Sequence, residues 1–155
     1  MKDLVLTDDI IARCSEEDPC YKAVFEYDSF KVSVFFMTES QDDMLLNSMR
    51  SAFLELYENL PSVDRFAEDY MKDSFSEETI DILREYHHED SLTKEEIIGN
   101  VYLGIIRIEE DGTAECDYIF RGSRYTTQFT FKFVSCGNIE SLHSCTWEND
   151  DYPEF

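Results

Sequence analysis

The chain contains few residues that interrupt regular structure and few that carry positive charge. Only five of its 155 residues are glycine and three are proline, which leaves little room for a flexible linker. This length is usual for one domain, so we expect a single domain over residues 1–155. Thirteen lysines and arginines stand against 35 aspartates and glutamates, and the formal net charge is −22.

The shortage of lysine and arginine restricts the partners of the protein. A protein that binds nucleic acid through its phosphates needs a basic surface, and an anionic membrane repels a chain of this charge. Solubility requires a net charge of only roughly 2–8 in magnitude. Two explanations stay open: an acidic cytosolic protein whose charge implies no partner, and an acidic field that attracts and steers a basic protein.

Long apolar runs and paired cysteines are also lacking. The N-terminal sequence MKDLVLTDD has three consecutive apolar residues before two aspartates, too few for the core of a signal peptide. No stretch approaches the roughly 18 apolar residues of a membrane-spanning helix. The cysteines are odd in number and form no CxxC pair, which predicts free thiols in a reducing cytoplasm; they are Cys14, Cys20, Cys116, Cys136 and Cys145.

What the chain does contain is enough apolar and aromatic material for a folded core. Hydrophobic residues make up 43% of it, with 12 phenylalanines and nine tyrosines. β-forming residues over 21–37, interrupted by YDSF, predict a hairpin or two adjacent strands. A weaker strand is expected at residues 3–7.

The next segment changes to the spacing of helices. Apolar residues three and four positions apart predict a helix over 40–60, capped by Ser40 or Asp42 and ended by Pro61. A second helix is expected over 62–72, and its inward face is apolar.

A third helix is expected to begin at Ser74, with Glu77 at the spacing of a capping box. One more helical turn is predicted over 93–98, with Thr93 as its cap. The residues that the third helix should bury are Phe75, Thr79, Ile82, Leu83 and Tyr86.

The last third of the chain has the pattern of strands. Asp111–Gly112 suits a tight hairpin turn, and residues 125–134 alternate apolar with polar side chains as a half-buried strand does. Four strands joined by short loops form a meander. We therefore predict an α+β fold: an antiparallel β-sheet made of the N-terminal hairpin and the C-terminal four-stranded meander, with a three-helix layer inserted between them and packed on one face.

Three of these segments carry a resemblance to a known family. They are the hairpin EEDGTAECDYIF, the phenylalanine-rich strand YTTQFTFKFV and the turn SCGNIES, which follow a helical insert. Over residues 20–147 the chain resembles a family of uncharacterised small acidic bacterial domains found among candidate immunity proteins of polymorphic toxins. The resemblance implies this fold and a neutralising role, and it assigns no catalytic residues.

Adjacent histidines in REYHHED are the first candidate for metal binding or acid–base chemistry. Helical ligands usually lie four residues apart, whereas His87 and His88 point about 100° apart. Glu89 and Asp90 follow where the helix is expected to end. Imidazoles in a last helical turn also interact favourably with the helix dipole, with Arg84 one turn before His88. The spacing favours this structural role.

A second candidate is a zinc site on the late strands. His143 and Cys145 are two residues apart on one strand, Cys136 lies across the preceding turn, and Cys116 could supply a fourth ligand. The structural alternative is that these cysteines are small core residues, and the absence of CxxC spacing favours it.

No motif supports an enzyme or a cofactor. There is no GxSxG sequence, RGSR is a turn between strands, and no glycine-rich phosphate loop is present. Carboxylates are so abundant that any chosen catalytic pair would be arbitrary. We expect no catalytic residue, no cofactor and no bound metal.

The acidic residues are unevenly distributed. Residues 38–98 hold 17 acids and five bases, whereas residues 121–147 hold one acid and three bases. The end WENDDYPEF adds four acids, and residues 148–155 are expected to form an acidic, frayed tail. Amphipathic helices place charge outward in any case, but aromatic residues flanked by carboxylates also suit a docking surface. The candidate partner-binding residues are Asp64, Glu68, Glu77, Glu78, Asp81, Glu85, Trp147, Glu148, Asp150 and Asp151.

The leading hypothesis is a monomeric, cytoplasmic, non-enzymatic protein that neutralises a basic protein partner. A bacterial nuclease toxin is a natural partner because it must itself bind phosphate. Two alternatives stay open. One is an enzyme or metal-dependent domain that uses the Cys136, His143 and Cys145 group or the histidine pair. The other is an accessory scaffold domain with no link to a toxin.

Overall fold

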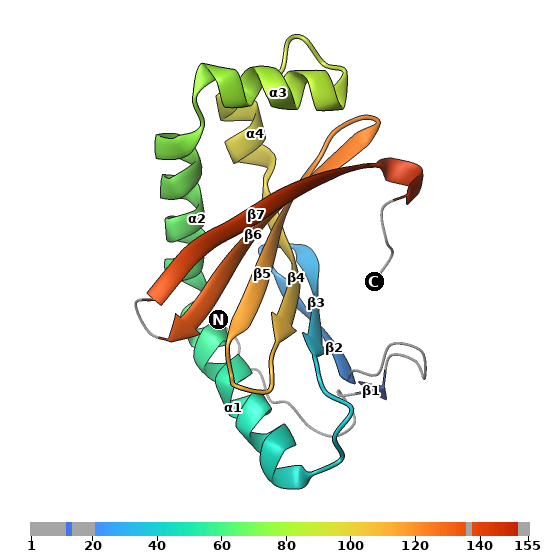
Figure 1. Ribbon diagram of the computed structural model, residues 1–155, viewed down its shortest axis with the longest axis vertical. Coiled ribbons are helices and arrows are strands. Elements are labelled where there is room, and N and C mark those ends of the chain that lie inside the picture. Colours follow the sequence, from blue (N-terminus) through green and yellow to red (C-terminus); the bar gives the residue numbers. More distant parts are fainter. Residues whose placement is uncertain (1–11, 14–20, 136–137, 152–155) are drawn as a thin grey trace.

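The computed structural model describes residues 12–13, 21–135 and 138–151, which form a seven-stranded sheet and four α-helices (Figure 1). The expected strand at 3–7 lies outside these residues. The strands are β1 (Ala12–Arg13), β2 (Tyr21–Tyr27), β3 (Phe30–Phe36), β4 (Tyr102–Ile108), β5 (Ala114–Arg121), β6 (Tyr125–Ser135) and β7 (Asn138–Glu148). The helices are α1 (Asp43–Glu58), α2 (Leu60–Ser74), α3 (Glu77–His87) and α4 (Lys94–Asn100), and η1 (Asn149–Asp151) is a short 3-10 helix.

The strands lie in the sheet in their chain order, from β1 to β7. All neighbouring pairs are antiparallel except β3 and β4, which run parallel from Ser33 opposite Ile105 to Phe36 opposite Ile108. The predicted α+β fold is confirmed, but the expectation of a wholly antiparallel sheet is wrong at this pair. All four helices separate β3 from β4, and this crossover returns the chain to the end of the sheet where β3 began.

Both predicted hairpins close on backbone conformations with positive φ. In the β2–β3 turn, Asp28 and Ser29 have φ values of 49° and 71°, as a two-residue turn of the I′ type requires. In the β4–β5 turn, Gly112 has a φ of 86°, and the amide of Glu109 donates to the carbonyl of Thr113 over 2.8 Å.

The core lies between one face of the sheet and the helices. Strand alternation turns Val34, Phe36 and Phe131 to this face, where they are buried together with Met49 and Phe53 of α1. Helices α1 and α2 run along one side of the sheet, and α3 lies across its end (Figure 1). Within the part of the chain that the structure describes, no helix is long and apolar enough to cross a membrane.

The boundary between the first two helices differs from the prediction. Helix α1 is capped by Asp42, whose side chain accepts a 3.0 Å hydrogen bond from the amide of Met44, and it ends at Glu58. Pro61 does not end α1; it lies in the first turn of α2. Proline suits this place because the first turn of a helix leaves its amides unpaired.

The third helix begins two residues later than expected. Ser74 is the last residue of α2, and Ser76 caps α3 by accepting a 3.2 Å hydrogen bond from the amide of Thr79. The predicted cap of α4 is confirmed, since Thr93 Oγ1 accepts from the amide of Glu96 over 3.1 Å. The capping-box spacing therefore indicated a helix at the right place but with the wrong first residue.

The buried face of α3 is also rotated from the prediction. Ile80, Leu83 and His87 are buried, at the spacing of a narrow stripe. Ile82 and Tyr86, which were expected to be buried, are 46% and 57% exposed. Because α3 crosses the end of the sheet, only one edge of the helix is covered, and two large apolar side chains stay at the surface.

Candidate functional site

A groove of about 690 Å³ lies between α3 and β7, the last strand in the sheet order, and we call it the α3–β7 groove. Its floor is formed by Phe129 and Phe131 of β6. One wall comes from the C-terminal part of α2 and from α3, and the other from β7. The lining residues are Tyr70, Ser74, Phe75, Thr79, Ile82, Leu83, Tyr86, Phe129, Phe131, His143, Ser144, Cys145, Thr146 and Trp147.

The helical wall of the groove exposes three large side chains to solvent. Ile82 and Tyr86 of α3 are about half exposed, and Tyr70 of α2 is 37% exposed. Scattered exposed apolar residues are ordinary, but here they border one hollow that also has an aromatic floor. The groove therefore combines an aromatic floor with a helical wall that exposes large side chains to solvent.

Two of the predicted acidic residues lie beside these exposed side chains. Glu78 is four residues before Ile82 and Glu85 is three residues after it, so all three share one side of α3. Both glutamates are exposed, and neither forms an ion pair with another described residue. They place unpaired negative charge beside Ile82, which lines the α3–β7 groove, and we call this side of α3 the rim of the groove.

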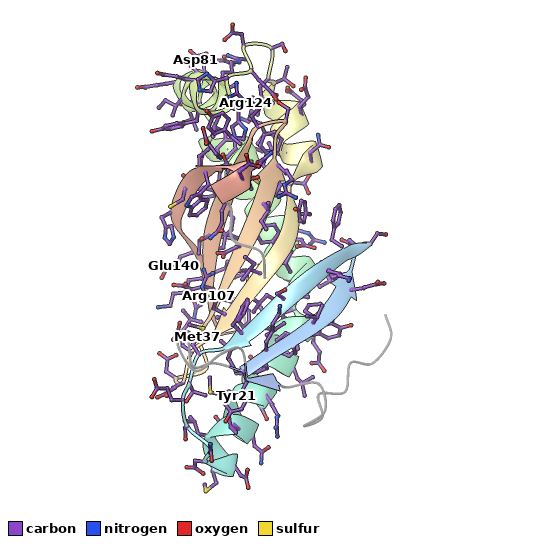
Figure 2. All side chains as sticks on the ribbon, turned by 90° about the vertical axis from the view of Figure 1, so that its right-hand side faces the viewer. Tyr21, Met37, Asp81, Arg107, Arg124 and Glu140 are labelled. Atoms are coloured by element: carbon purple, nitrogen blue, oxygen red, sulfur yellow. The ribbon has the colours of Figure 1, made fainter. Side chains whose placement is uncertain are left out.

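The other two acids of α3 are partly neutralised within the helix. Asp81 accepts from Arg84 over 2.7 Å, and Glu77 lies 3.9 Å from the same guanidinium. Arg84 also donates to the carbonyl of Leu92 over 2.7 Å, which joins α3 to the start of the α4 region. Asp81 lies at the α3 end of the molecule, as does Arg124 of the β5–β6 turn (Figure 2).

The predicted tail is attached to the sheet as far as it is described. The amide of Asn149 donates to the carbonyl of Arg124 over 2.8 Å, and its side chain bonds Thr126 and Gly122. Trp147 lines the groove, and Glu148 follows it at the end of β7.

The acids of the tail follow directly on these contacts. Glu148 and Asp150 are exposed, and Asp151 is the last residue of η1. The structure thus brings Trp147, near the end of β7, and the wall of α3 to opposite sides of one groove. Residues 152–155 lie outside the described residues.

Asp64 and Glu68, the two predicted residues of α2, lie in a different place. They line a smaller pocket of about 210 Å³, which we call the Asp64 pocket and which shares no lining residue with the groove. Asp64 accepts a 2.5 Å hydrogen bond from the hydroxyl of Tyr27 and another from the hydroxyl of Tyr118. Burial raises the pKa of Asp64 above its ordinary value, although these two hydrogen bonds oppose the shift.

The histidine pair has structural roles. His87 is buried, its Nε2 lies 2.6 Å from Thr127 Oγ1, and its ring packs edge-on against Phe120. Burial lowers the pKa of His87, which holds the imidazole neutral. His88 ends α3 in the left-handed conformation, with a φ of 52°, and stacks on Tyr125. The two rings therefore have separate surroundings, and their sequence position did not reveal that His87 is buried.

The cysteines and His143 do not converge among the described residues. Cys116 lies on the helix-covered face of the sheet opposite Phe131, whereas Cys145 lies opposite Gln128 on the other face and is exposed. Burial raises the pKa of the Cys116 thiol. Cys136 is outside the described residues. Across residues 12–13, 21–135 and 138–151, no group of three histidine, cysteine, aspartate or glutamate side chains could hold a metal ion.

One buried charge pair was missed by the sequence reasoning. Asp117 is fully buried on the sheet face opposite the core, where the guanidinium of Arg107 donates to both of its oxygens. Thr130 donates to the same carboxylate over 2.8 Å, and Glu115 lies 3.2 Å from Arg107. The sequence does contain a signal for this pair, because Arg107 and Asp117 each lie within a β-strand, and a charged residue that becomes buried there usually requires a partner.

Comparison of the chain with protein-family models, with curated protein sequences and with solved structures found no match. The resemblance to the toxin-immunity family stays a prediction.

Proposed function

We propose that the protein binds a basic partner protein through the α3–β7 groove and neutralises it, without catalysing a reaction itself. The observation that carries this proposal is the exposure of Ile82 and Tyr86 on the wall of the groove, beside the exposed Glu78 and Glu85 of the same helix. Apolar and aromatic anchors supply most of the affinity in an interface, and surrounding charges supply steering and orientation.

The occupant of the groove is an apolar segment of the partner flanked by lysine or arginine. Its apolar side chains would cover Ile82, Tyr86 and the floor, while its basic side chains pair with the glutamates of the rim. The net charge of −22 attracts such a partner over a longer range than the rim alone.

The partner that we propose is a nuclease-type toxin, with this chain as its immunity protein. A nuclease binds phosphate through lysine and arginine, so the acids of this chain would occupy the groups that hold nucleic acid. The support is the charge complementarity together with the resemblance of residues 20–147 to the immunity family.

The test is binding between the purified chain and the basic protein encoded beside it, at low and at moderate salt. We expect rapid association that slows as salt rises, because salt screens the steering charges. The variants Ile82→Ala and Tyr86→Ala should each dissociate faster, with a loss of more than about 1 kcal/mol if they are anchors. Met44→Ala is the matched control, since Met44 is 82% exposed on α1, away from the groove.

The charge of the rim is tested separately with the double variant Glu78→Gln and Glu85→Gln. It should slow association and make the association rate less dependent on salt. The control is Glu55→Gln with Glu58→Gln, which removes two exposed acids of α1 and should have a smaller effect on both quantities. Absence of binding to any co-encoded basic protein, at low as well as moderate salt, would refute the proposed function.

A further inference from the structure

The Asp64 pocket lies where several elements meet. The turn between β2 and β3, helix α2 and the start of β4 each contribute to its lining, and Tyr118 of β5 closes the inner side. Its lining includes Tyr27, Phe30, Asp64, Glu68, Tyr102 and Tyr118.

Asp64 is a half-buried carboxylate with no cation beside it. Its hydrogen-bond partners are the neutral hydroxyls of Tyr27 and Tyr118, and no lysine or arginine lines the pocket. Glu68 adds further negative charge; it pairs with Lys72 over 2.7 Å, but both of those side chains are more than half exposed. Removal of a carboxylate from water costs free energy unless it is compensated, so this site favours an external cation.

The carboxylate also keeps capacity for more hydrogen bonds. Each of its oxygens accepts one bond from a tyrosine, whereas an ionised carboxylate offers about four acceptor positions. Burial raises the pKa of Asp64 because its charged form is disfavoured there, and the nearby charge of Asp28 acts in the same direction. A positive group beside Asp64 would oppose both effects, because it stabilises the charged form of the carboxyl group.

The remaining walls of the pocket are aromatic and apolar. Phe30 and Tyr102 stack with their ring centroids 4.3 Å apart and an interplanar angle of 9°, and Tyr27 and Tyr118 stand beside them in the lining. Met71 of α2 contributes to the apolar remainder. Aromatic rings attract cations, and apolar walls favour a cation that carries carbon over a fully hydrated ion.

We propose that the Asp64 pocket binds an alkylammonium group, which donates hydrogen bonds to Asp64 and packs its carbon atoms against the aromatic walls. An ammonium head has three donors, which is enough to fill the roughly two acceptor positions that the tyrosines leave unused on the carboxylate. The same group occurs in a small free amine and at the end of a lysine side chain of another protein. Because the pocket and the α3–β7 groove have no lining residue in common, this site does not depend on the proposed function.

The test is a titration of the full chain followed by backbone-amide NMR. The probes are n-butylammonium chloride and n-butanol, which have similar carbon chains and differ in charge. We expect saturable shifts at Tyr27, Asp64 and Tyr118 with butylammonium and no saturation with butanol. Equal responses to the two probes, or no response at these residues, would overturn the proposal.

Variants establish whether Asp64 itself binds the cation. Asp64→Asn should bind butylammonium about tenfold more weakly, as expected for the loss of a charge-assisted hydrogen bond. Glu55→Gln, an exposed acid on α1, should leave the affinity unchanged. If Asp64→Asn does not fold, Tyr27→Phe provides the same readout through a smaller loss of affinity. Unchanged affinity in whichever of the two folds would overturn the proposal.

A third probe separates the two sources of the ammonium group. Lysine blocked at both its amino and carboxyl ends presents only its side chain, as a lysine in a protein does. Binding comparable to that of butylammonium would identify a partner's lysine as an acceptable source, whereas binding of butylammonium alone would identify a free amine. Either result supports an ammonium site, and failure of the basic protein to bind the groove would leave it intact.

Discussion

Asp64 and Asp117 are both withdrawn from water, but the protein compensates their charges differently. Asp117 is fully buried in the sheet and receives two hydrogen bonds from Arg107 and one from Thr130. Asp64 is half-buried in its pocket and receives hydrogen bonds only from two tyrosine hydroxyls. One carboxylate carries its cation within the fold, and the other has none among the residues that the structure describes.

The difference indicates which acid belongs to the fold and which can take part in binding. A buried charge pair is costly to disrupt, because removal of one partner leaves the other charge buried and alone. A carboxylate held by neutral donors at the edge of a pocket can exchange water for an external cation. In a chain with 35 acidic residues, the type of compensation is therefore more informative than the number of acids.

The strongest test of this comparison is Arg107→Met. It leaves Asp117 without its cation, so we expect a loss of about 3–5 kcal/mol in the free energy of unfolding. Urea denaturation measures it, with Arg65→Met as the control because Arg65 is exposed on α2. The double variant Arg107→Met with Asp117→Leu should recover much of the loss. A loss below about 1 kcal/mol would show that Asp117 does not need its cation.

A smaller effect is expected from Tyr118→Phe, which removes one donor from Asp64. Hydrogen bonds to charged groups contribute about 1.5–3 kcal/mol, and partial exposure of Asp64 places the expected loss near the lower value. The same substitution made in an Asp64→Asn background should cost less, which a double-mutant cycle by urea denaturation can measure. Equal losses in the two backgrounds would mean that Tyr118 does not act through Asp64.

His87 extends the comparison to a buried group that stays neutral. Its pKa is lowered by burial, so the unfolded chain takes up a proton at a higher pH than the folded chain does. The contribution of His87 to stability is therefore present above its ordinary pKa of 6.5 and is lost as pH falls through the lowered value. The advantage of the wild type over His87→Gln in urea denaturation should shrink below pH 6.5. A constant difference across this range would contradict the assignment.

The smallest effect on stability at neutral pH is expected for Asp64→Asn. No internal cation is lost, so the free energy of unfolding should change by less than about 1 kcal/mol. Because the folded-state pKa of Asp64 is raised, its contribution to stability is present at low pH and is lost as pH rises through that pKa. The free energy of unfolding of the wild type should therefore rise relative to that of Asp64→Asn as the pH is lowered. A loss as large as that of Arg107→Met would place a hidden cation at Asp64.

The sequence predicted the elements of the fold better than their arrangement. Strand alternation located β6 and the hairpin turns, since side-chain period and turn conformation are local properties. The parallel pairing of β3 with β4 could not be predicted in this way, because it depends on the path of the chain through four helices. Likewise, the exposed side of α3 is decided by its place across the end of the sheet.

The candidate sites also depend on tertiary arrangement, which the sequence does not reveal for single side chains. The acids of α3 and the tail were predicted as one set. Helix α3 and Trp147 of β7 lie on opposite sides of the α3–β7 groove, but none of these acids is among its described lining residues. Asp64 belonged to the same predicted set, but it lies in a different pocket. There its carboxylate accepts hydrogen bonds from Tyr27 and Tyr118, which come from strands distant in the sequence. Composition can locate charge, but only tertiary contacts determine which charge is compensated.

The parallel contact between β3 and β4 has a consequence for the order of folding. The β2–β3 hairpin and the β4–β7 meander form from neighbouring parts of the chain, so their loop-closure entropies are small. The contact of β3 with β4 encloses residues 37–101, and it is the only strand pairing in the described sheet with such a separation. Long-range pairing of this kind slows folding. The two halves of the sheet should therefore form first, and their joining along β3 and β4 should limit the rate at which the native protein appears.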